Sequence, residues 1–359
     1  MTAELTIERQ PFGTLSDGRP AELFTLRNAK GSSVKITNFG GTITSIVVGD
    51  RSGRYADVTL GFDKLAPYLE NKPFFGSIIG RFGNRIAGAA YELDGQSFGL
   101  TPNDGPNSLH GGPGGFHKKL WSARELMLDG QVALELTTIS PDGEEGLGGN
   151  LAVHVTYSLS CENELRIDYR ATCDKSTVIN LTNHAYFNLK GPAAGGPGGI
   201  VDHKLTLAAD AFTPTDAASI PTGEIRPVEG TVMDFRTPRP IGPRINDPDE
   251  QLVFGKGYDH NWIVRGGGQG ELVLAARLEE PVSGRVMEVL TTEPGIQFYS
   301  GNFLEGVRGK GGQVYHSRDG LCLETQHYPD SPHHPHFPST VLRPGQEYRS
   351  TTVYKFATV

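Results

Sequence analysis

Residues 321–335 read Leu321-Cys322-Leu323-Glu324-Thr325-Gln326-His327-Tyr328-Pro329-Asp330-Ser331-Pro332-His333-His334-Pro335, and the first six of them decide the fold class. Their side chains alternate, with Leu321, Leu323 and Thr325 on one side and Cys322, Glu324 and Gln326 on the other. A period of two is typical of a β-strand, whose successive side chains point to opposite faces. At Tyr328-Pro329 the pattern stops, and the prolines that follow predict an extended loop.

Glu324 lies near the end of this predicted strand. A rigid sheet holds a carboxylate in one position, which is what a general base requires. The alternative is a glutamate on an edge strand that faces water. The stretch alone leaves both interpretations open, so the other polar motifs have to decide between them.

Composition and charge exclude several classes of protein. Lys and Arg number 33 against 41 Asp and Glu, a net charge of −8 without long runs of one sign, whereas a nucleic-acid-binding surface is basic and clustered. Met1–Arg9 lacks the apolar core of a signal peptide, and no 18-residue apolar run predicts a membrane span. Cys161, Cys173 and Cys322 are too few and too scattered for a disulfide framework or a zinc site. We expect a soluble, cytoplasmic protein with reduced thiols.

Short alternating apolar runs recur along the chain between turn signals such as Asp94-Gly95 and Asp319-Gly320. The strands predicted from these runs are Ser33–Thr37, Ile43–Val48, Val132–Thr138, Leu151–Ser158, Leu165–Thr172, Val178–Thr182, Leu272–Leu278, Val286–Thr291 and Ser350–Phe356. Amphipathic helices are scarce, and the two candidates are Lys64–Glu70 and Arg244–Asp247. Many strands without alternating helices favour an all-β fold, a large antiparallel β-sandwich with few short helices.

We expect one domain over residues 1–359, a length that all-β sandwiches reach. The Gly-rich segment Lys190–Gly199 has predicted strands on both sides, so it is interpreted as an insertion loop within that domain.

The first polar motif, Gly80–Ile86, carries Asn84 and Arg85, whose fixed donors and acceptors suit a hydroxyl-rich ligand. Its Gly-x-Gly spacing does not indicate a phosphate loop, because no Lys-Ser/Thr follows and no helix is signalled. The alternative is a surface loop in which Arg81 and Arg85 are solvated.

Two further motifs carry histidines. His110 stands directly before a glycine pair in Asn107–Gly112, where backbone can approach a ligand closely, although the glycines can also serve only a loop. His184 follows an apolar run in Leu181–Leu189, with asparagines and two aromatic residues beside it. Aromatic faces next to polar groups suit the C–H patches of a sugar. The alternative for His184 is a core histidine satisfied by asparagine.

The segment Lys256–Trp262 contains Asp259 between aromatic residues, and a turn rich in Asp and Asn is its alternative interpretation. Pro294–Gly301 predicts a strand that carries Gln297 among apolar neighbours. The remaining histidines of interest are His327, His333, His334 and His336. Their spacing, interrupted by prolines, matches no zinc pattern, so no metal site is predicted there.

Five segments occur together and in one order: Gly80–Ile86, Asn107–Gly112, Leu181–Leu189, Tyr258–Asn261 and Leu323–Gln326. With them the chain resembles the aldose 1-epimerase (galactose mutarotase) family over nearly its whole length. The second and third segments are fairly specific, whereas the others are weak singly. The resemblance implies a large β-sandwich of the galactose mutarotase type (a supersandwich), an open sugar-binding cleft on one concave sheet, no cofactor and no metal.

The resemblance also implies roles for individual residues. Glu324 matches the family's general base, His184 its general acid, and His110 a second active-site histidine near the ring oxygen of the sugar. The positions that match sugar-binding residues are Asn84, Arg85, Asp259 and Gln297. The implied reaction interconverts the α and β anomers of free aldoses such as galactose and glucose. It opens the cyclic hemiacetal by acid and base catalysis, rotates about C1–C2 and closes the ring again. An ionised Glu324 and a protonated His184 suit this reaction near neutral pH.

Two other functions remain open. An epimerase of a hexose 6-phosphate needs a basic cluster for the phosphate, and its candidates Arg51, Arg54, Arg81 and Lys118-Lys119 are scattered along the chain. A non-catalytic carbohydrate-binding sandwich needs aromatic platforms but no acid and base together. We expect a small-molecule aldose as the partner, with no nucleic acid and no membrane, and a monomer or a homodimer. The preferred sugar depends on the orientation of single hydroxyl groups, which the sequence does not give.

Overall fold

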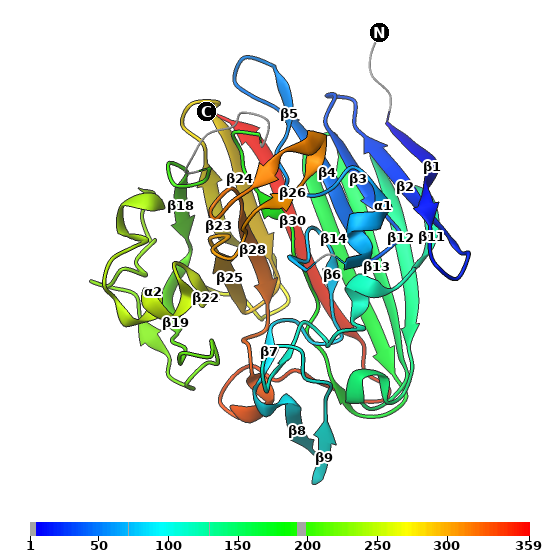
Figure 1. The fold of residues 1–359 in the computed structure, drawn as a ribbon, viewed down its shortest axis with the longest axis vertical. Coiled ribbons are helices and arrows are strands. Elements are labelled where there is room, and N and C mark those ends of the chain that lie inside the picture. The colour runs from blue at the N-terminus through cyan, green and yellow to red at the C-terminus, as the bar shows by residue number, and fades with distance from the viewer. Residues whose placement is uncertain (1–4, 71, 129, 192–198) are drawn as a thin grey trace.

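A computed structural model describes residues 5–70, 72–128, 130–191 and 199–359, and it consists mainly of antiparallel β-sheets (Figure 1). Every pair between its named strands is antiparallel, which confirms the all-β prediction. Most of the Gly-rich segment Lys190–Gly199, namely residues 192–198, lies outside the described residues. No helix among the described residues is long and apolar enough to cross a membrane.

The largest sheet has nine strands in the order β11-β12-β13-β14-β30-β24-β23-β18-β21. Their bounds are β11 Ser122–Leu128, β12 Gln131–Ser140, β13 Leu151–Ser160, β14 Glu164–Cys173, β30 Tyr348–Thr358, β24 Arg285–Thr291, β23 Val273–Glu279, β18 Lys204–Leu207 and β21 Arg239–Pro240. Buried and partly exposed residues alternate along β14, because one face of this strand packs into the core. The red strand β30 lies between the green β14 and the gold β24 and so joins the two halves of the sheet (Figure 1).

A six-stranded sheet runs in the order β17-β28-β25-β22-β19-β20. Its strands are β17 Tyr186–Phe187, β28 Leu321–Gln326, β25 Gly295–Tyr299, β22 Asp259–Val264, β19 Ala209–Thr213 and β20 Arg226–Pro227. All six residues of β28 are buried. Leu321 and Leu323 belong to the main hydrophobic core, and Thr325 Oγ1 lies 2.5 Å from Thr352 Oγ1 of β30. The nine-stranded sheet therefore covers one face of β28, and the other face carries Glu324.

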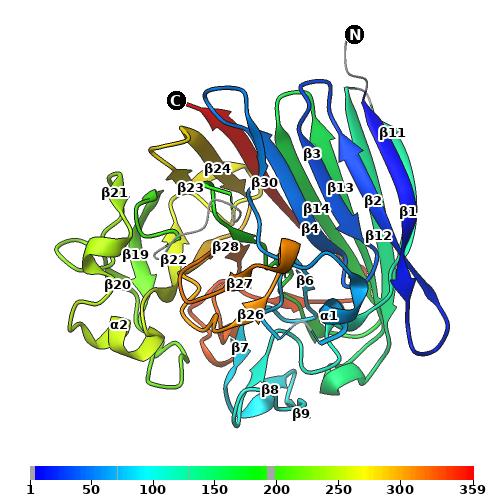
Figure 2. The same cartoon turned by 45° about the horizontal axis from the view of Figure 1, so that its top comes forward.

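A five-stranded sheet, β1 to β5, forms the N-terminal part of the fold. Its strands are β1 Thr6–Thr14, β2 Pro20–Arg27, β3 Ser33–Thr37, β4 Thr42–Gly49 and β5 Tyr55–Asp57. Figure 2 shows the blue strands of this sheet beside the green strands β12 and β13. Phe24 and Ile36 on this side share one buried cluster with Leu134 and Val155 on the other, so the two sheets form a sandwich.

Short strand pairs and single turns of helix complete the fold. The pairs are β6 Ile78–Ile79 with β16 Thr182–Asn183, β7 Arg85–Ile86 with β10 Ser108–Leu109, β8 Ala90–Leu93 with β9 Gln96–Gly99, β15 Thr177–Val178 with β29 Val341–Leu342, and β26 Val307–Arg308 with β27 Val314–Tyr315. The 3₁₀ turns are Ala87–Ala89, Phe116–Lys118, Glu144–Gly146, Gly242–Arg244, Lys310–Gly312 and Ser331–His333.

Most predicted strands coincide with observed ones to within two residues, and α1 Leu65–Glu70 matches the first predicted helix. Two predictions are wrong. The run Val178–Thr182 is not one strand but contributes to β15 and β16, which pair with different partners. The predicted helix Arg244–Asp247 is replaced by α2 Glu250–Gly255, which begins where the side chain of Asp249 accepts a hydrogen bond from the backbone N–H of Gln251.

Candidate active site

A cavity of about 580 Å³ opens where the six-stranded sheet meets the loops around β6, β7 and β10. Its walls are formed by Phe62, Pro67, Glu70, Lys72, Pro73, Phe74, Asn84, Arg85, Leu109, His110, His184, Tyr186, Asp259, Tyr299, Phe303, Leu304, Val307, Arg308 and Glu324. Mixed apolar walls with a few convergent polar groups are typical of a small-molecule site. Six of the seven predicted site residues lie in these walls.

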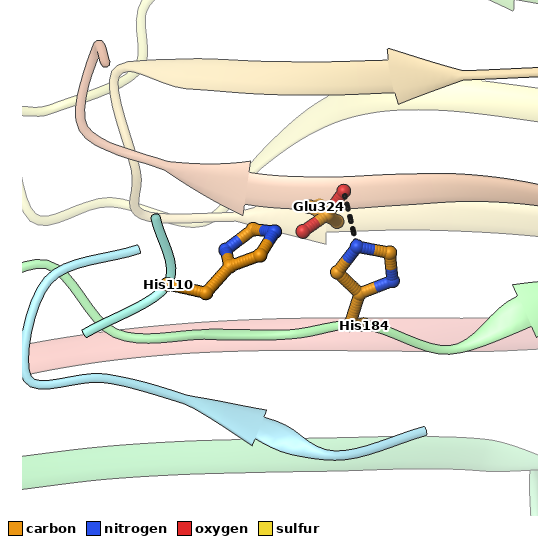
Figure 3. Close-up of side chains that lie close together, drawn as sticks. All are labelled: His110, His184 and Glu324. Atoms are coloured by element: carbon orange, nitrogen blue, oxygen red, sulfur yellow. Dashed lines mark ion pairs between the residues drawn. The ribbon is translucent and has the colours of Figure 1, made fainter. Parts of the chain in front are cut away.

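Glu324 projects from β28 into the cavity and is 2% exposed. Its Oε1 lies 3.6 Å from His184 Nε2, and its Oε2 has no hydrogen-bond partner (Figure 3). A buried oxygen without a partner carries a cost of about 1–3 kcal/mol unless a ligand supplies a donor. The alternative of a glutamate on an edge strand facing water is therefore wrong, and Oε2 is free to accept a hydrogen bond from a ligand.

His184 lies in the turn between β16 and β17 and is also buried. While Nε2 faces Glu324, Nδ1 lies 3.5 Å from the Sγ atom of Cys322, two residues before Glu324 on the same face of β28. The ring stacks on Tyr186, with centroids 5.2 Å apart. The neighbouring Asn183 donates to the carbonyl of Gly76 instead, so His184 is not a core histidine satisfied by asparagine.

His110 follows β10 and is joined to Asn84 by two hydrogen bonds. The backbone N–H of Asn84 donates to His110 Nδ1 at 3.1 Å, and the N–H of His110 donates to the carbonyl of Asn84 at 3.0 Å. Because Nδ1 accepts a hydrogen bond, the proton of the neutral imidazole is on Nε2. Gly111 is required by the loop, since a Cβ there would lie 2.0 Å from the carbonyl oxygen of Gly80.

Arg85 and Asp259 are charged residues of the cavity walls whose charges act on Glu324. The guanidinium of Arg85 donates to Asp104 at 2.7 Å, which fixes its position. Gln297 is buried behind the cavity wall rather than in it, and its Nε2 donates to Asp259 Oδ1 at 2.8 Å. Gln297 is thus placed to orient Asp259.

Burial changes the protonation of the acidic and basic groups in opposite directions. It raises the pKa of Glu324 well above its usual range, and the negative charge of Asp259 raises it further, although Arg85 opposes both. It lowers the pKa of His184 to about 4 and that of His110 well below its usual value. Burial therefore shifts both groups toward their uncharged forms, the carboxylic acid of Glu324 and the neutral imidazole of His184.

A metal fits this arrangement poorly. Among the residues that the structure describes, His110, His184 and Glu324 form one group whose ligand atoms lie within 4.8 Å of one another. Ligands of a tetrahedral zinc with bonds of about 2.0–2.1 Å lie roughly 3.4 Å apart, so the side chains would have to move. In addition, Nδ1 of His110 accepts a backbone hydrogen bond, which keeps the proton on Nε2, the atom that a metal would need deprotonated.

The other motifs have structural roles. Arg81 is buried and donates to the carbonyls of Gly148 and Gly149 at 2.8 and 3.0 Å, so a solvated arginine is the wrong interpretation for it. The segment around Asp259 is not a turn, because Asp259 begins strand β22; its aromatic residues Tyr258 and Trp262 are buried in the core.

The histidines after β28 fix a loop. His327 pairs with the buried Glu293 at 2.6 Å, and His333 with Asp330 at 2.7 Å. Nε2 of His336 lies 2.7 Å from the carbonyl oxygen of Gly223.

Several apolar residues of the cavity walls were not predicted from the sequence. The residues concerned are Phe74, Tyr299 and Phe303, and the sequence pattern around them predicts only loop or core. Tyr186, in contrast, lies beside His184 as expected. Only the approach of distant segments in the fold places these rings around the histidines.

Comparisons with known proteins identify the family of this chain. The family model described as Aldose 1-epimerase matches residues 22–355. This chain belongs to the aldose 1-epimerase family. It is 46% identical to the galactose mutarotase of Sus scrofa over 355 residues, which cover 98% of this chain and 99% of that protein.

Two more members of the aldose 1-epimerase family extend the likeness to bacteria and to solved structures. The aldose 1-epimerase of Escherichia coli (strain K12) is 40% identical over 342 residues, 95% of this chain and 96% of that protein. The crystal structure of galactose 1-epimerase from Lactobacillus acidophilus NCFM superposes with a TM-score of 0.86 at 27% identity and covers 99% of both chains. The predicted galactose mutarotase-like sandwich is thereby confirmed.

Proposed function

We propose that this chain is a mutarotase that interconverts the α and β anomers of free aldoses such as galactose and glucose. The observation that carries the proposal is the buried pair of Glu324 and His184, 3.6 Å apart in the wall of a cavity that other polar groups also line. The hydroxyl oxygen on C1 and the ring oxygen of an aldose are bonded to the same carbon. A base and an acid that serve them must therefore lie this close together.

Ring opening moves two protons. Glu324 takes the proton of the C1 hydroxyl on Oε2, while Nε2 of His184 gives a proton to the ring oxygen. The bond from C1 to the ring oxygen breaks and C1 becomes an aldehyde. After rotation about C1–C2, closure on the other face returns both protons. The pair starts as carboxylate and imidazolium and becomes carboxylic acid and imidazole, with one shared proton at each stage.

The bound sugar helps to charge the pair. Burial disfavours both charges and so favours the form of the pair in which the shared proton is on Glu324. A C1 hydroxyl that donates to Oε2 stabilises the carboxylate, and a ring oxygen that accepts from Nε2 stabilises the imidazolium. Transfer of the proton from Glu324 to His184 is thus coupled to substrate binding.

The remaining polar groups hold the sugar. His110, neutral and protonated on Nε2, donates a hydrogen bond near the ring oxygen. Asn84, Arg85 and Asp259 contact the other hydroxyls, and Gln297 acts by orienting Asp259.

Polarimetry on freshly dissolved α-D-glucose and α-D-galactose tests these roles. We expect the wild type to speed the decay of rotation, and Glu324→Gln or His184→Gln to lower kcat by about 10²–10⁴-fold with little change in KM. Glu293→Gln, which changes another buried glutamate outside the cavity, is the matched control and retains activity. A Glu324→Gln variant with most of its activity refutes the base, and a pure rise in KM for His184→Gln makes His184 a binding residue.

A hexose 6-phosphate is disfavoured as the substrate. None of the basic residues suggested for a phosphate lines the cavity: Lys118 donates to the carbonyls of Leu69 and Glu70, and Lys119 pairs with Glu144. Lys72 and Arg308 do line it, so glucose and glucose 6-phosphate should be compared directly. Intact sugar binding without any acceleration of decay would instead favour a non-catalytic carbohydrate-binding protein.

We also propose that residues 1–359 fold as one domain in the cytoplasm, as a monomer or homodimer. One core cluster that includes both Phe24 and Phe356 supports the single domain, and the three unpaired cysteines support a reducing compartment. Limited proteolysis, cell fractionation and light scattering test these three points.

A further inference from the structure

Phe74 has a backbone conformation that a bulky residue rarely adopts. It lies in the loop between α1 and β6 with a φ of 61°. Left-handed backbone is strained at such a residue, and it persists where the surroundings impose it, often beside a functional site. The consequence here is that two successive rings point to different places, Phe74 into the cavity and Phe75 into a hydrophobic cluster with Phe62 and Tyr186.

The loop that follows Phe74 is hydrogen-bonded to the backbone of His184 on both sides. The N–H of Gly76 donates to the carbonyl of His184 at 2.9 Å, and the N–H of His184 donates to the carbonyl of Ser77 at 3.0 Å. Position 76 admits only glycine, because a Cβ would lie 1.9 Å from the carbonyl oxygen of Ile43. The backbones of Phe74 and His184 are therefore fixed relative to each other.

The Phe74 ring contacts three imidazoles. It stacks on His184 with centroids 5.8 Å apart and an interplanar angle of 28°, and it meets the rings of His110 and His117 edge-on, each at 4.8 Å. Tyr186 also stacks on His184. No other ring contacts both His110 and His184 among the aromatic contacts of the described residues.

We propose that Phe74 is a positioning residue for the acid of the reaction: its ring fixes the plane of the His184 imidazole and keeps water away from it. This inference rests on the proposed role of His184. The imidazole of His184 must direct Nε2 at the ring oxygen of the sugar and also stay in contact with Glu324, so it tolerates little rotation of its ring. Loss of the ring lets water and alternative orientations reach the imidazole.

The same ring adds to the burial that lowers the pKa of His184 to about 4. The titratable groups that face this imidazole are Glu324, Cys322, Tyr186, His110 and, across Phe74, His117. Replacing Phe74 by a small residue admits water, so the pKa of His184 should rise toward its ordinary value of about 6.5.

The test is polarimetry from pH 4 to 9 on Phe74→Gly, which removes the ring and also the backbone strain, so that it should fold. We expect kcat to fall by about 10- to 100-fold with little change in KM, as for a small misplacement of a reacting group. We also expect the acid limb of kcat/KM to move up from near pH 4. Phe74→Tyr, which keeps the ring at this partly exposed position, should retain most of the kcat and the wild-type acid limb.

Ser219→Gly is the matched control, because Ser219 also has a left-handed backbone (φ 60°) but lies in a turn outside the cavity walls. It should leave kcat and the pH profile unchanged. If Phe74→Gly keeps its kcat, or loses kcat without a shift of the acid limb, while His184→Gly or His184→Gln is inactive, the positioning role is wrong and the proposed function stands. A wild type that accelerates mutarotation of no sugar overturns both.

Discussion

Glu324→Gln should make the protein less active and more stable at the same time. The folded protein buries Glu324 in a place that raises the pKa of its carboxyl well above the unfolded value of about 4.3. Below pH 4.3 the carboxyl is protonated in both states, so its ionisation contributes nothing to the stability difference. As the pH rises from there, the unfolded chain ionises while the folded protein does not, so stability is lost until the pH passes the raised pKa. Gln carries no such penalty.

The size of the effect follows from this linkage. Over the interval between the two pKa values, the wild type should lose about 1.4 kcal/mol of stability per pH unit relative to Glu324→Gln. For a chain of this length, 1.4 kcal/mol corresponds to a difference in Tm of about 2 °C. His184 is buried in both proteins, so its contribution largely cancels in the comparison.

Thermal unfolding of both proteins at pH 4.5, 5.5 and 6.5 measures the difference in Tm between Glu324→Gln and the wild type. The matched control is Glu293→Gln. Burial also raises the pKa of Glu293, but the charge and hydrogen bond of His327 outweigh it, and the pKa is lowered overall. This substitution should therefore destabilise the protein at pH 6.5. A Glu324→Gln variant that melts below the wild type, or a gap that is the same at pH 4.5 and 6.5, would refute the reasoning.

Three further predictions concern the site. The kcat/KM of the wild type should stay level through pH 6.5. It should fall at acid pH, where His184 (pKa about 4) is protonated while Glu324 is still a carboxylic acid, and at alkaline pH, where both groups have lost their protons. An acid limb near pH 6.5 contradicts this prediction. Gln297→Leu removes the donor to Asp259 and should raise KM for galactose more than it lowers kcat, and the opposite split in polarimetric rates would place Gln297 in the chemistry. Dialysis against EDTA should leave mutarotation unchanged, because the tautomer of His110 disfavours a metal; activity that disappears and returns with zinc would show otherwise.

The fold could be predicted where burial is one-sided. Along β13 and β14, buried and exposed residues alternate, and the alternation is visible in the sequence. The prediction of one strand over Val178–Thr182 was wrong because a continuous apolar run does not indicate which strand each residue pairs with. Helix α2 carries a cap at Asp249 that a search for capping residues would have found.

The site could be predicted residue by residue only through the resemblance. Alternation placed Glu324 on a strand, but its burial depends on the loops that close over β28, which are far away in the sequence. The shift of both groups toward their uncharged forms could not be predicted for the same reason, because the pKa of a free side chain does not include burial. Phe74 is absent from the prediction because its direction depends on a backbone angle that no pattern encodes.

The position of β30 has a consequence for synthesis in the cell. This strand, residues 348–358, lies between β14 and β24 and pairs with both. Its partners in β14 are separated from it by about half the length of the chain. While a ribosome is still making the chain, both neighbours present open edges, which favour aggregation. A premature stop codon that removes only these residues should therefore yield insoluble protein rather than a weakened enzyme, and a growing chain should depend on chaperones until its final strand emerges.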